Sequence, residues 1–275
     1  MSATFHKMHG NGNDFVLLDL RAQDYALDSN GVRAMADRHR GVGFDQLLVL
    51  YPPTTATALA RVEIWNADGS RAEQCGNGMR CIADYLHRQG EAGDDPFSVE
   101  GPVETIHMAW IEPGMTRVDM GRPAFGPDAV PTNLVPNGDE YSLDIDGATC
   151  RFGAVSMGNP HVVIRVEHAA TAPVARLGPA IGHHPAFPRG CNVGFAEITS
   201  RTGIRLRVHE RGAAETAACG SGACAAVAVL QRAGLLDDEV EVVQNGGRLI
   251  IGRNADTGSI WMTGPAAHVF QGMIE

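Results

Sequence analysis

Two short stretches of the sequence place a cysteine directly before a glycine-rich turn. Residues 74–81 read QCGNGMRC and residues 218–225 read ACGSGACA, so Cys75 and Cys219 share a Cys-Gly-x-Gly arrangement. A thiol can act as an acid or a base, because it ionises near pH 8.5 in water and lower beside positive charge. A lone cysteine of this kind is more often a small buried apolar residue. The recurrence of this motif indicates that the two cysteines take part in a reaction.

The recurrence belongs to a longer internal repeat. Shifting the chain by 144 positions aligns residues 62–90 with 206–234 without a gap. GNDFVLL at 12–18 resembles GNPHVVI at 158–164, and VGF at 42–44 recurs at 193–195. Three ordered matches at nearly constant offset predict a duplicated domain.

Each copy shows the same predicted elements. Residues 61–65 and 205–209 alternate in polarity as half-buried strands do, and a helix is predicted after each cysteine. Asn77 and Ser221 are the predicted N-caps, and Gly90 and Gly234 stand where the helices should end. The second helix is apolar nearly all round, whereas the first is more amphipathic. With the many short apolar segments elsewhere, the predicted class is α+β in two similar lobes.

The cysteines are therefore expected at helix N-termini, where the helix dipole should lower the pKa of a thiol. If the two lobes face each other, one thiol lies on each side of a bound molecule. Inversion of a stereocentre with an acidic hydrogen needs a base on one face and an acid on the other. Backbone N–H groups at the helix starts could stabilise the carbanion; these are at Gly76, Asn77, Gly220 and Ser221.

Composition limits the partners and the cofactors. The chain has 32 acidic and 22 basic residues, a net charge of −10, which argues against a nucleic acid or an anionic membrane as partner and favours a small molecule. No apolar signal segment is evident, so a cytoplasmic protein is expected, with its six cysteines as thiols. The only lysine is Lys7. Because pyridoxal phosphate needs a Schiff-base lysine, a reaction without cofactor is preferred.

The ordered motifs of the chain resemble those of the diaminopimelate epimerase family. They are HKMHGNGNDF, GFDQL, NADGSRAEQCGNGMRC, GAVSMGNPH, HERGAAETAACGSGACAA and MTGPA. The resemblance implies interconversion of LL- and meso-diaminopimelate by two cysteines, without metal or coenzyme, in a homodimer. It also implies two pseudo-symmetric lobes, each a mainly antiparallel sheet wrapped around a central helix. The implied division is residues 1–118 plus 264–275, carrying Cys75, and residues 119–263, carrying Cys219.

The resemblance also implies the roles of individual residues. Cys75 and Cys219 would be the acid and the base, with the reacting carboxylate at the four helix-start residues named above. Arg211 would bind the distal carboxylate and Glu210 the distal ammonium group, while His161 would support the site from close by. Five amides would surround the remaining substrate: Asn13, Gln46, Asn66, Asn159 and Asn192. The sequence departs from the family pattern at Asn11, His209, Ala214 and Ala218, positions without an assigned role.

Two alternatives remain open at this point. One is a related cofactor-free isomerase of the same architecture, such as a proline racemase or a phenazine-type isomerase. The other is a metal or redox module without enzymatic activity. The spacing of the cysteines argues against a structural metal site, because it is longer than the usual gap of two to four residues. Four cysteines are expected to be structural or core residues: Cys81, Cys150, Cys191 and Cys224.

Overall fold

The structure is a computed structural model that describes residues 2–274, and the chain forms two compact units. The first unit ends at Asp119 and resumes at Thr263, while the second spans Met120–Met262. Relative to the division expected from the sequence, the chain enters the second unit one residue later and leaves it one residue earlier.

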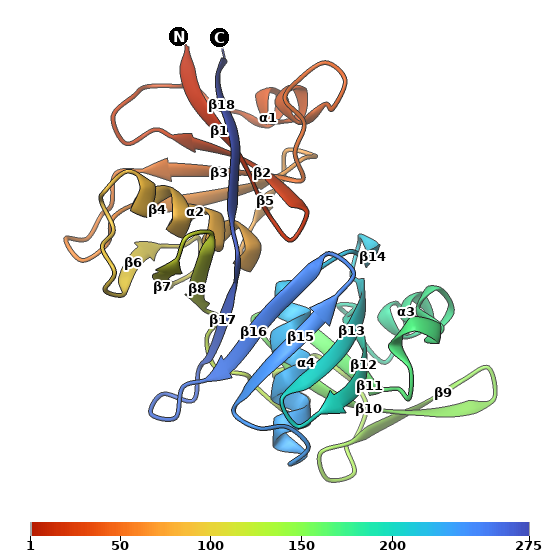
Figure 1. Ribbon diagram of the computed structural model, residues 1–275. Coiled ribbons are helices and arrows are strands. Elements are labelled where there is room, and N and C mark those ends of the chain that lie inside the picture. Colours follow the sequence, from red (N-terminus) through yellow and green to blue (C-terminus); the bar gives the residue numbers. More distant parts are fainter. Residues whose placement is uncertain (1, 275) are drawn as a thin grey trace. The chain divides into compact units, whose positions relative to one another are not determined.

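The first unit is a curled sheet around one helix, α2 (Figure 1). Neighbouring strands follow the order β18, β1, β2, β3, β4, β6, β7, β8, and β5 also pairs with β4. Only the β2–β3 and β4–β6 pairs in this series are parallel. The elements are β1 (Ala3–Gly10), β2 (Asn13–Asp19), α1 (Ser29–Ala36), β3 (Gln46–Tyr51), β4 (Arg61–Asn66), β5 (Arg71–Ala72), α2 (Gly76–Arg88), β6 (Phe97–Glu100), β7 (Thr105–Glu112), β8 (Met115–Asp119) and β18 (Ala267–Ile274).

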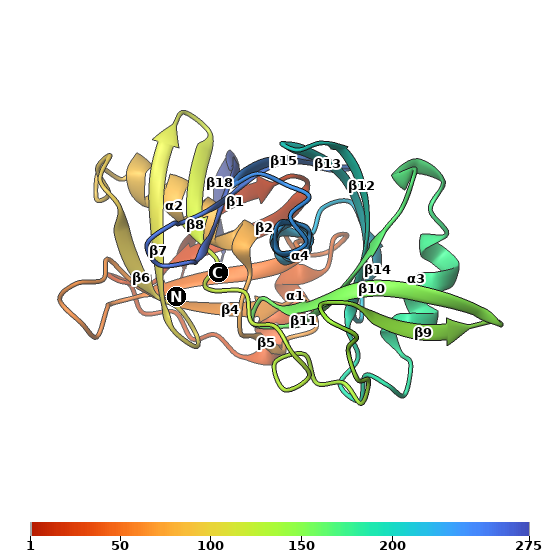
Figure 2. The same cartoon turned by 90° about the horizontal axis from the view of Figure 1, so that it is seen from below.

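The second unit repeats this plan around helix α4, which Figure 2 shows end-on inside its sheet. Its strands follow the order β9, β10, β11, β12, β13, β15, β16, with parallel pairs at β11–β12 and β13–β15, and β14 pairs with β13. The elements are β9 (Tyr141–Ile145), β10 (Ala148–Ser156), β11 (Pro160–Arg165), η1 (Ala169–Thr171), α3 (Val174–Gly182), β12 (Asn192–Ser200), β13 (Gly203–Glu210), β14 (Ala214–Thr216), α4 (Gly220–Arg232), β15 (Glu239–Gln244), β16 (Gly247–Arg253) and β17 (Ile260–Pro265), the last of which leads back to the first unit. The predicted α+β fold of two similar units is confirmed.

The central strands are buried on both faces, which explains why they read as continuous apolar runs. In β2, Val16 and Leu18 pack with Val32 and Met35 of α1 in one core cluster. Phe15 and Leu17 alternate with them and point to the opposite face, toward α2. The second unit has a corresponding core beneath α3.

Both central helices end as predicted, and α2 is buried on its polar side as well as on its apolar side. Gly90 and Gly234 follow the C-caps with φ of +74° and +71°, the left-handed region that glycine adopts readily. Helix α2 is buried at every residue from Asn77 to Leu86, including Arg80 and Asp84. The apparent polar face of α2 is therefore an interior polar contact surface.

Candidate active site

Each cysteine of the repeat is itself the N-cap of its helix. The Gly78 N–H donates to Cys75 Sγ, and the Gly222 N–H donates to Cys219 Sγ, both at 3.4 Å. The prediction that Asn77 and Ser221 are the caps was wrong, because the sulfur atoms take the place of the usual cap oxygen. Asn77 and Ser221 lie one residue inside the helices that begin at Gly76 and Gly220.

The second glycine of each turn, three residues after the cysteine, explains why the thiol precedes a glycine-rich turn. A Cβ on Gly78 would lie 2.8 Å from Leu48 Cδ2 and 3.4 Å from Cys75 Sγ. At Gly222 it would lie 3.0 Å from Val208 Cγ2 and 3.1 Å from Cys219 Sγ. Glycine thus lets the first helical turn approach both the adjacent strand and the sulfur.

In the first unit a chain of polar contacts runs to the start of α2. Asn13 Nδ2 donates to Asp45 Oδ2 at 2.9 Å, and Asn77 Nδ2 donates to Asn13 Oδ1 at 3.2 Å. Arg80 Nη1 donates to Asn77 Oδ1 at 2.9 Å, and its Nε donates to the Pro265 carbonyl at 3.2 Å. Because Asp45 only accepts and Arg80 only donates, the orientation of both amides is determined.

Two further predicted residues of the first unit contact each other. Gln46 Nε2 donates to Asn66 Oδ1 at 2.9 Å, and Asn66 Nδ2 donates to Ser70 Oγ at 3.0 Å. Lys7, by contrast, is held in an ion pair with Asp14.

In the second unit the amides surround a buried histidine. His161 Nε2 lies 2.8 Å from Asn159 Oδ1 and 3.4 Å from Asn192 Nδ2. Burial, and secondly the charge of Arg211, lower the pKa of His161 to about 3. Asn192 Oδ1 accepts from the Arg211 N–H at 2.8 Å, and Arg211 Nη1 donates to the Arg189 carbonyl at 2.8 Å.

The surroundings of Cys219 oppose ionisation of its thiol. Burial, and then the adjacent Glu210 carboxylate, raise the pKa of Cys219 well above its ordinary value, although the Gly222 N–H and the Ser221 hydroxyl act in the other direction. The expectation that the helix N-terminus makes this thiol more acidic was therefore wrong, because desolvation outweighs the dipole. Glu210 also accepts a hydrogen bond from Thr216 at 2.5 Å.

The strand registers show which residues correspond between the units. Phe15 pairs with Gln46 as His161 pairs with Asn192. Gln46 lies opposite Asn66, and the β12–β13 register places Asn192 opposite Glu210. The second unit thus has an anion where the first has the neutral amide of Asn66.

Several other features of the two units have no assigned role in the site. Cys81, Cys191 and Cys224 are fully buried and Cys150 is partly buried, in agreement with core positions. Among residues 2–274, no group of three or more metal-binding side chains is assembled, and no helix has the length and apolar character to cross a membrane.

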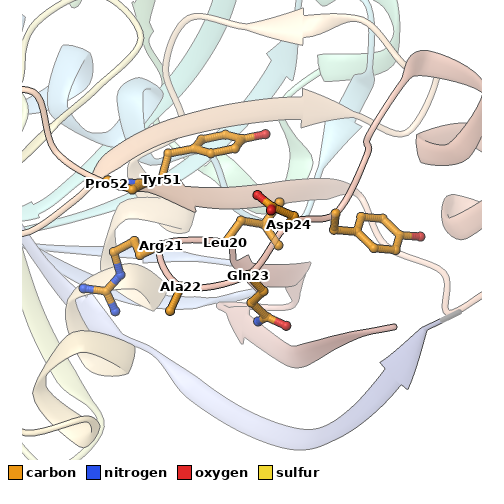
Figure 3. Close-up of a pocket in the computed structure, with 8 residues that line it drawn as sticks. Leu20, Arg21, Ala22, Gln23, Asp24, Tyr51 and Pro52 are labelled. Carbon is orange, nitrogen blue, oxygen red and sulfur yellow. The ribbon is translucent and has the colours of Figure 1, made fainter. Parts of the chain in front are cut away.

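A hollow of about 310 Å³ beside β3 is lined by a separate set of residues (Figure 3): Leu20, Arg21, Ala22, Gln23, Asp24, Tyr25, Tyr51 and Pro52.

Sequence reasoning missed two residues that contact the site. Arg80 was predicted only to lie in the helix after Cys75, without a role in the site. No motif or repeat in the sequence pointed to Gln244. Gln244 accepts a hydrogen bond from the Cys219 N–H at 2.7 Å. The Gln244 contact spans 25 residues, so no local pattern could have found it, whereas Arg80 donates to Asn77 at the helical i, i+3 spacing.

Comparison with known proteins assigns the fold and then the family. A probable proline racemase from Agrobacterium radiobacter, solved with bound carbonate, is similar with a TM-score of 0.71 and 15% identity, covering 99% of this chain and 93% of that one. The two-unit fold is thus one found among racemases and related isomerases. The family model for diaminopimelate epimerase matches residues 5–126 and 153–269. The chain belongs to the diaminopimelate epimerase family.

Two curated relatives have the same sequence identity to this chain but are named as different enzymes. The diaminopimelate epimerase of Thioalkalivibrio sulfidiphilus is 48% identical over 277 residues, with 100% of both chains covered. The O-ureido-serine racemase of Streptomyces lavendulae is 48% identical over 272 residues, covering 98% of this chain and 94% of that one.

Proposed function

We propose that this protein is a diaminopimelate epimerase that inverts the α-carbon with Cys75 and Cys219, without a cofactor, in the cytoplasm. The observation that carries the proposal is the matched pair of cysteine N-caps in the two units of a chain of this family. The two units would be the lobes predicted from the sequence, and each would contribute one sulfur to proton transfer at the α-carbon.

The helix starts supply the electrostatics that the reaction needs. The α-hydrogen of an amino acid is only weakly acidic, so the negative charge that develops on the adjacent carboxylate has to be stabilised. The first N–H groups of α2 and α4 are unsatisfied within the helices and favour an anion. Gly76, Asn77, Gly220 and Ser221 would therefore hold the reacting carboxylate.

The environment of Cys219 suggests its resting protonation state. Burial and the Glu210 carboxylate raise the pKa of Cys219, so this thiol is protonated at neutral pH and can act as the acid. Cys75 would then be the base in that direction, and the roles reverse in the other.

The remaining predicted residues would bind the distal part of the substrate. The guanidinium of Arg211 suits a carboxylate and the carboxylate of Glu210 suits an ammonium group. The amides would hydrogen-bond the same head groups; they are Asn13, Gln46, Asn66, Asn159 and Asn192. His161 would orient Asn159 and Asn192, which it contacts.

The decisive experiment is incubation of the protein with LL-diaminopimelate in deuterated water and no added cofactor. We expect deuterium at the inverted α-carbon. Because each sulfur serves one face, Cys75→Ala and Cys219→Ala should each lower the rate by roughly 10²- to 10⁴-fold. Normal turnover by either variant would refute the assignment.

O-ureidoserine is the second candidate substrate, favoured by the relative that carries that name. Its ureido group is neutral, whereas diaminopimelate ends in a second charged amino-acid head. Arg211→Met should therefore lower kcat/KM for diaminopimelate by roughly tenfold or more and change it little for O-ureidoserine. A wild-type preference for O-ureidoserine in the same assay would reverse the choice of substrate.

A further inference from the structure

Gln244 forms a two-point contact with the backbone of Cys219. Its Oε1 accepts from the Cys219 N–H at 2.7 Å, and its Nε2 donates to the Cys219 carbonyl at 3.3 Å. The side chain is buried, with 7% exposure, at the end of β15. A single amide thus satisfies both backbone groups of the residue that carries the sulfur.

The contact lies at the start of α4, where backbone N–H groups have no partner within the helix. An N-cap residue has non-helical dihedrals, and its N–H makes no intrahelical bond. Cys219 has φ of −123° and ψ of 110°, and its carbonyl accepts the first helical bond, from Ala223. The amide of Gln244 therefore fixes the peptide groups on both sides of the Cys219 α-carbon, from which the sulfur projects.

The turn after β15 strengthens the same attachment. The Gly246 N–H donates to the Ala217 carbonyl at 2.6 Å, two residues before Cys219. Gln244 itself pairs with Gly247 across this turn. The β15–β16 hairpin thus holds the segment leading into α4 at two successive points.

The contact is not part of the duplicated plan. Arg61 and Arg205 are equivalent in the repeat, and they pair with Glu100 and Val243 respectively. Position 101 in the first unit therefore corresponds to Gln244, and it is a glycine without a side chain. The first unit cannot make this contact at that position.

We infer that Gln244 is a positioning residue that fixes the Cys219 sulfur relative to the substrate α-carbon. The inference rests on the proposed function, because it gives Cys219 a role in proton transfer. A displacement of about 1 Å in a reacting group can cost roughly 10²-fold in rate. Since Gln244 holds the backbone of Cys219 and not the substrate, its loss should act on kcat.

The test compares Gln244→Met, which has similar length and no amide, with a matched control. Gln231→Met removes another side-chain-to-backbone hydrogen bond of the second unit, from Gln231 Nε2 to the Asp237 carbonyl at 2.7 Å, at the far end of α4. We expect Gln244→Met to lower kcat for diaminopimelate by about 10- to 100-fold with KM changed by no more than about twofold. Gln231→Met, whose hydrogen bond is exposed, should lower the melting temperature by no more than Gln244→Met does and should leave kcat within about twofold of wild type.

A second measurement does not depend on activity. Hydrogen–deuterium exchange of the wild-type Cys219 amide should be slow, and Gln244→Met should accelerate it while leaving the amides around Cys75 unchanged. Wild-type kcat in folded Gln244→Met, or fast exchange of the Cys219 amide in the wild type, would overturn the inference. Inactivity of the wild type would instead refute the proposed function, and the exchange result would still report on the contact.

Discussion

The sulfur atoms of Cys75 and Cys219 accept the same hydrogen bond at the same distance, yet their surroundings differ. Cys75 is partly exposed, while Cys219 is 3% exposed and lies beside the Glu210 carboxylate. Duplication therefore preserved the geometry of the cap and changed the electrostatics around it. A two-base reaction needs one proton shared between two sulfurs, and an unequal environment provides a defined place for it.

Two departures from the family pattern lie at positions with a left-handed backbone. Asn11 and Ala214 have φ of +52° and +59°, in the left-handed region. Asparagine tolerates this region through local hydrogen bonding, whereas alanine is strained there by its Cβ. The backbone at position 214 thus has a conformation that glycine would adopt without this strain.

The first prediction concerns His161, whose counterpart in the first unit is the buried Phe15. Because the pKa of His161 is lowered to about 3 in the folded protein, the unfolded chain takes up this proton first as the pH falls below 6.5. Neutral His161 therefore contributes fully to the free energy of unfolding above pH 6.5, and this contribution is lost as the pH falls below 6.5. Between pH 8 and pH 5 the loss should be about 2 kcal/mol.

His161→Phe should remove this part of the acid sensitivity, since it places the first unit's residue at the same register. The measurement is the free energy of unfolding in urea at pH 8 and pH 5 for both proteins. Equal losses in the two proteins would contradict a neutral, buried His161. Glu104→Gln, a change in an exposed loop, serves as the control and should leave the wild-type loss unchanged.

At the scale of the elements, much of the fold could be predicted from the sequence. The period-2 strands, the helices after each cysteine and the glycines at their ends are local signals, and the repeat required that both units share them. The polar residues Arg80 and Asp84 of α2 are buried, which the amphipathic pattern of the helix does not reveal. Arg80 donates a hydrogen bond to the Pro265 carbonyl, 185 residues away, and Asp84 accepts one from Arg88, four residues later.

The candidate site was predictable where residues lie in motifs and not where they are joined through space. The helix starts at Cys75 and Cys219 follow from glycine-rich motifs, whereas Asn13 was assigned only through the family resemblance. The backbone of Cys219 depends on Gln244, 25 residues later in the chain, and Arg80 is held by the distant Pro265 carbonyl. Such tertiary contacts leave no periodic or spacing signal in one sequence.

The second prediction concerns the packing of β1 against α2. A Cβ on Gly10 would lie 2.9 Å from Arg80 Nη2 and 3.3 Å from the Pro265 carbonyl oxygen. Because Arg80 is fully buried, it has little room to move. Gly10→Ala should therefore destabilise the protein by about 1–3 kcal/mol, as overpacking does, and should reduce kcat/KM by disturbing Asn77.

Gly93→Ala is the matched control for this substitution. A Cβ at Gly93 meets nothing within 4 Å, so its free energy of unfolding should stay within about 0.5 kcal/mol of wild type. Denaturant unfolding measures both variants. If Gly10→Ala unfolds like Gly93→Ala, the close approach of Arg80 to β1 is not present in solution.

At the scale of the whole molecule, exposed apolar side chains concentrate on one strand of the first unit. Among the described residues, three of the six exposed large apolar side chains lie on β18: Val269, Phe270 and Met273. Strand β18 pairs with β1 along one side. Clustered apolar exposure on a strand typically marks an interface, because water contact with it is unfavourable.

We propose that these three side chains of β18 belong to the contact surface of the homodimer expected from the family resemblance. A two-fold dimer uses the same patch on both subunits, so one substitution changes the interface twice. Val269→Asp combined with Met273→Asp should therefore separate the subunits. These side chains are 55% and 69% exposed, so the change should cost the fold of a single chain little.

Sedimentation velocity at micromolar concentration tests this last prediction. We expect a dimer for the wild type and a monomer for the double variant, since the introduced carboxylates would be desolvated and repel each other in the interface. Val135→Asp alters a side chain that is 89% exposed in the second unit, and it should leave the dimer intact. A double variant that sediments as a dimer would place the interface elsewhere, and a monomeric wild type would refute the homodimer.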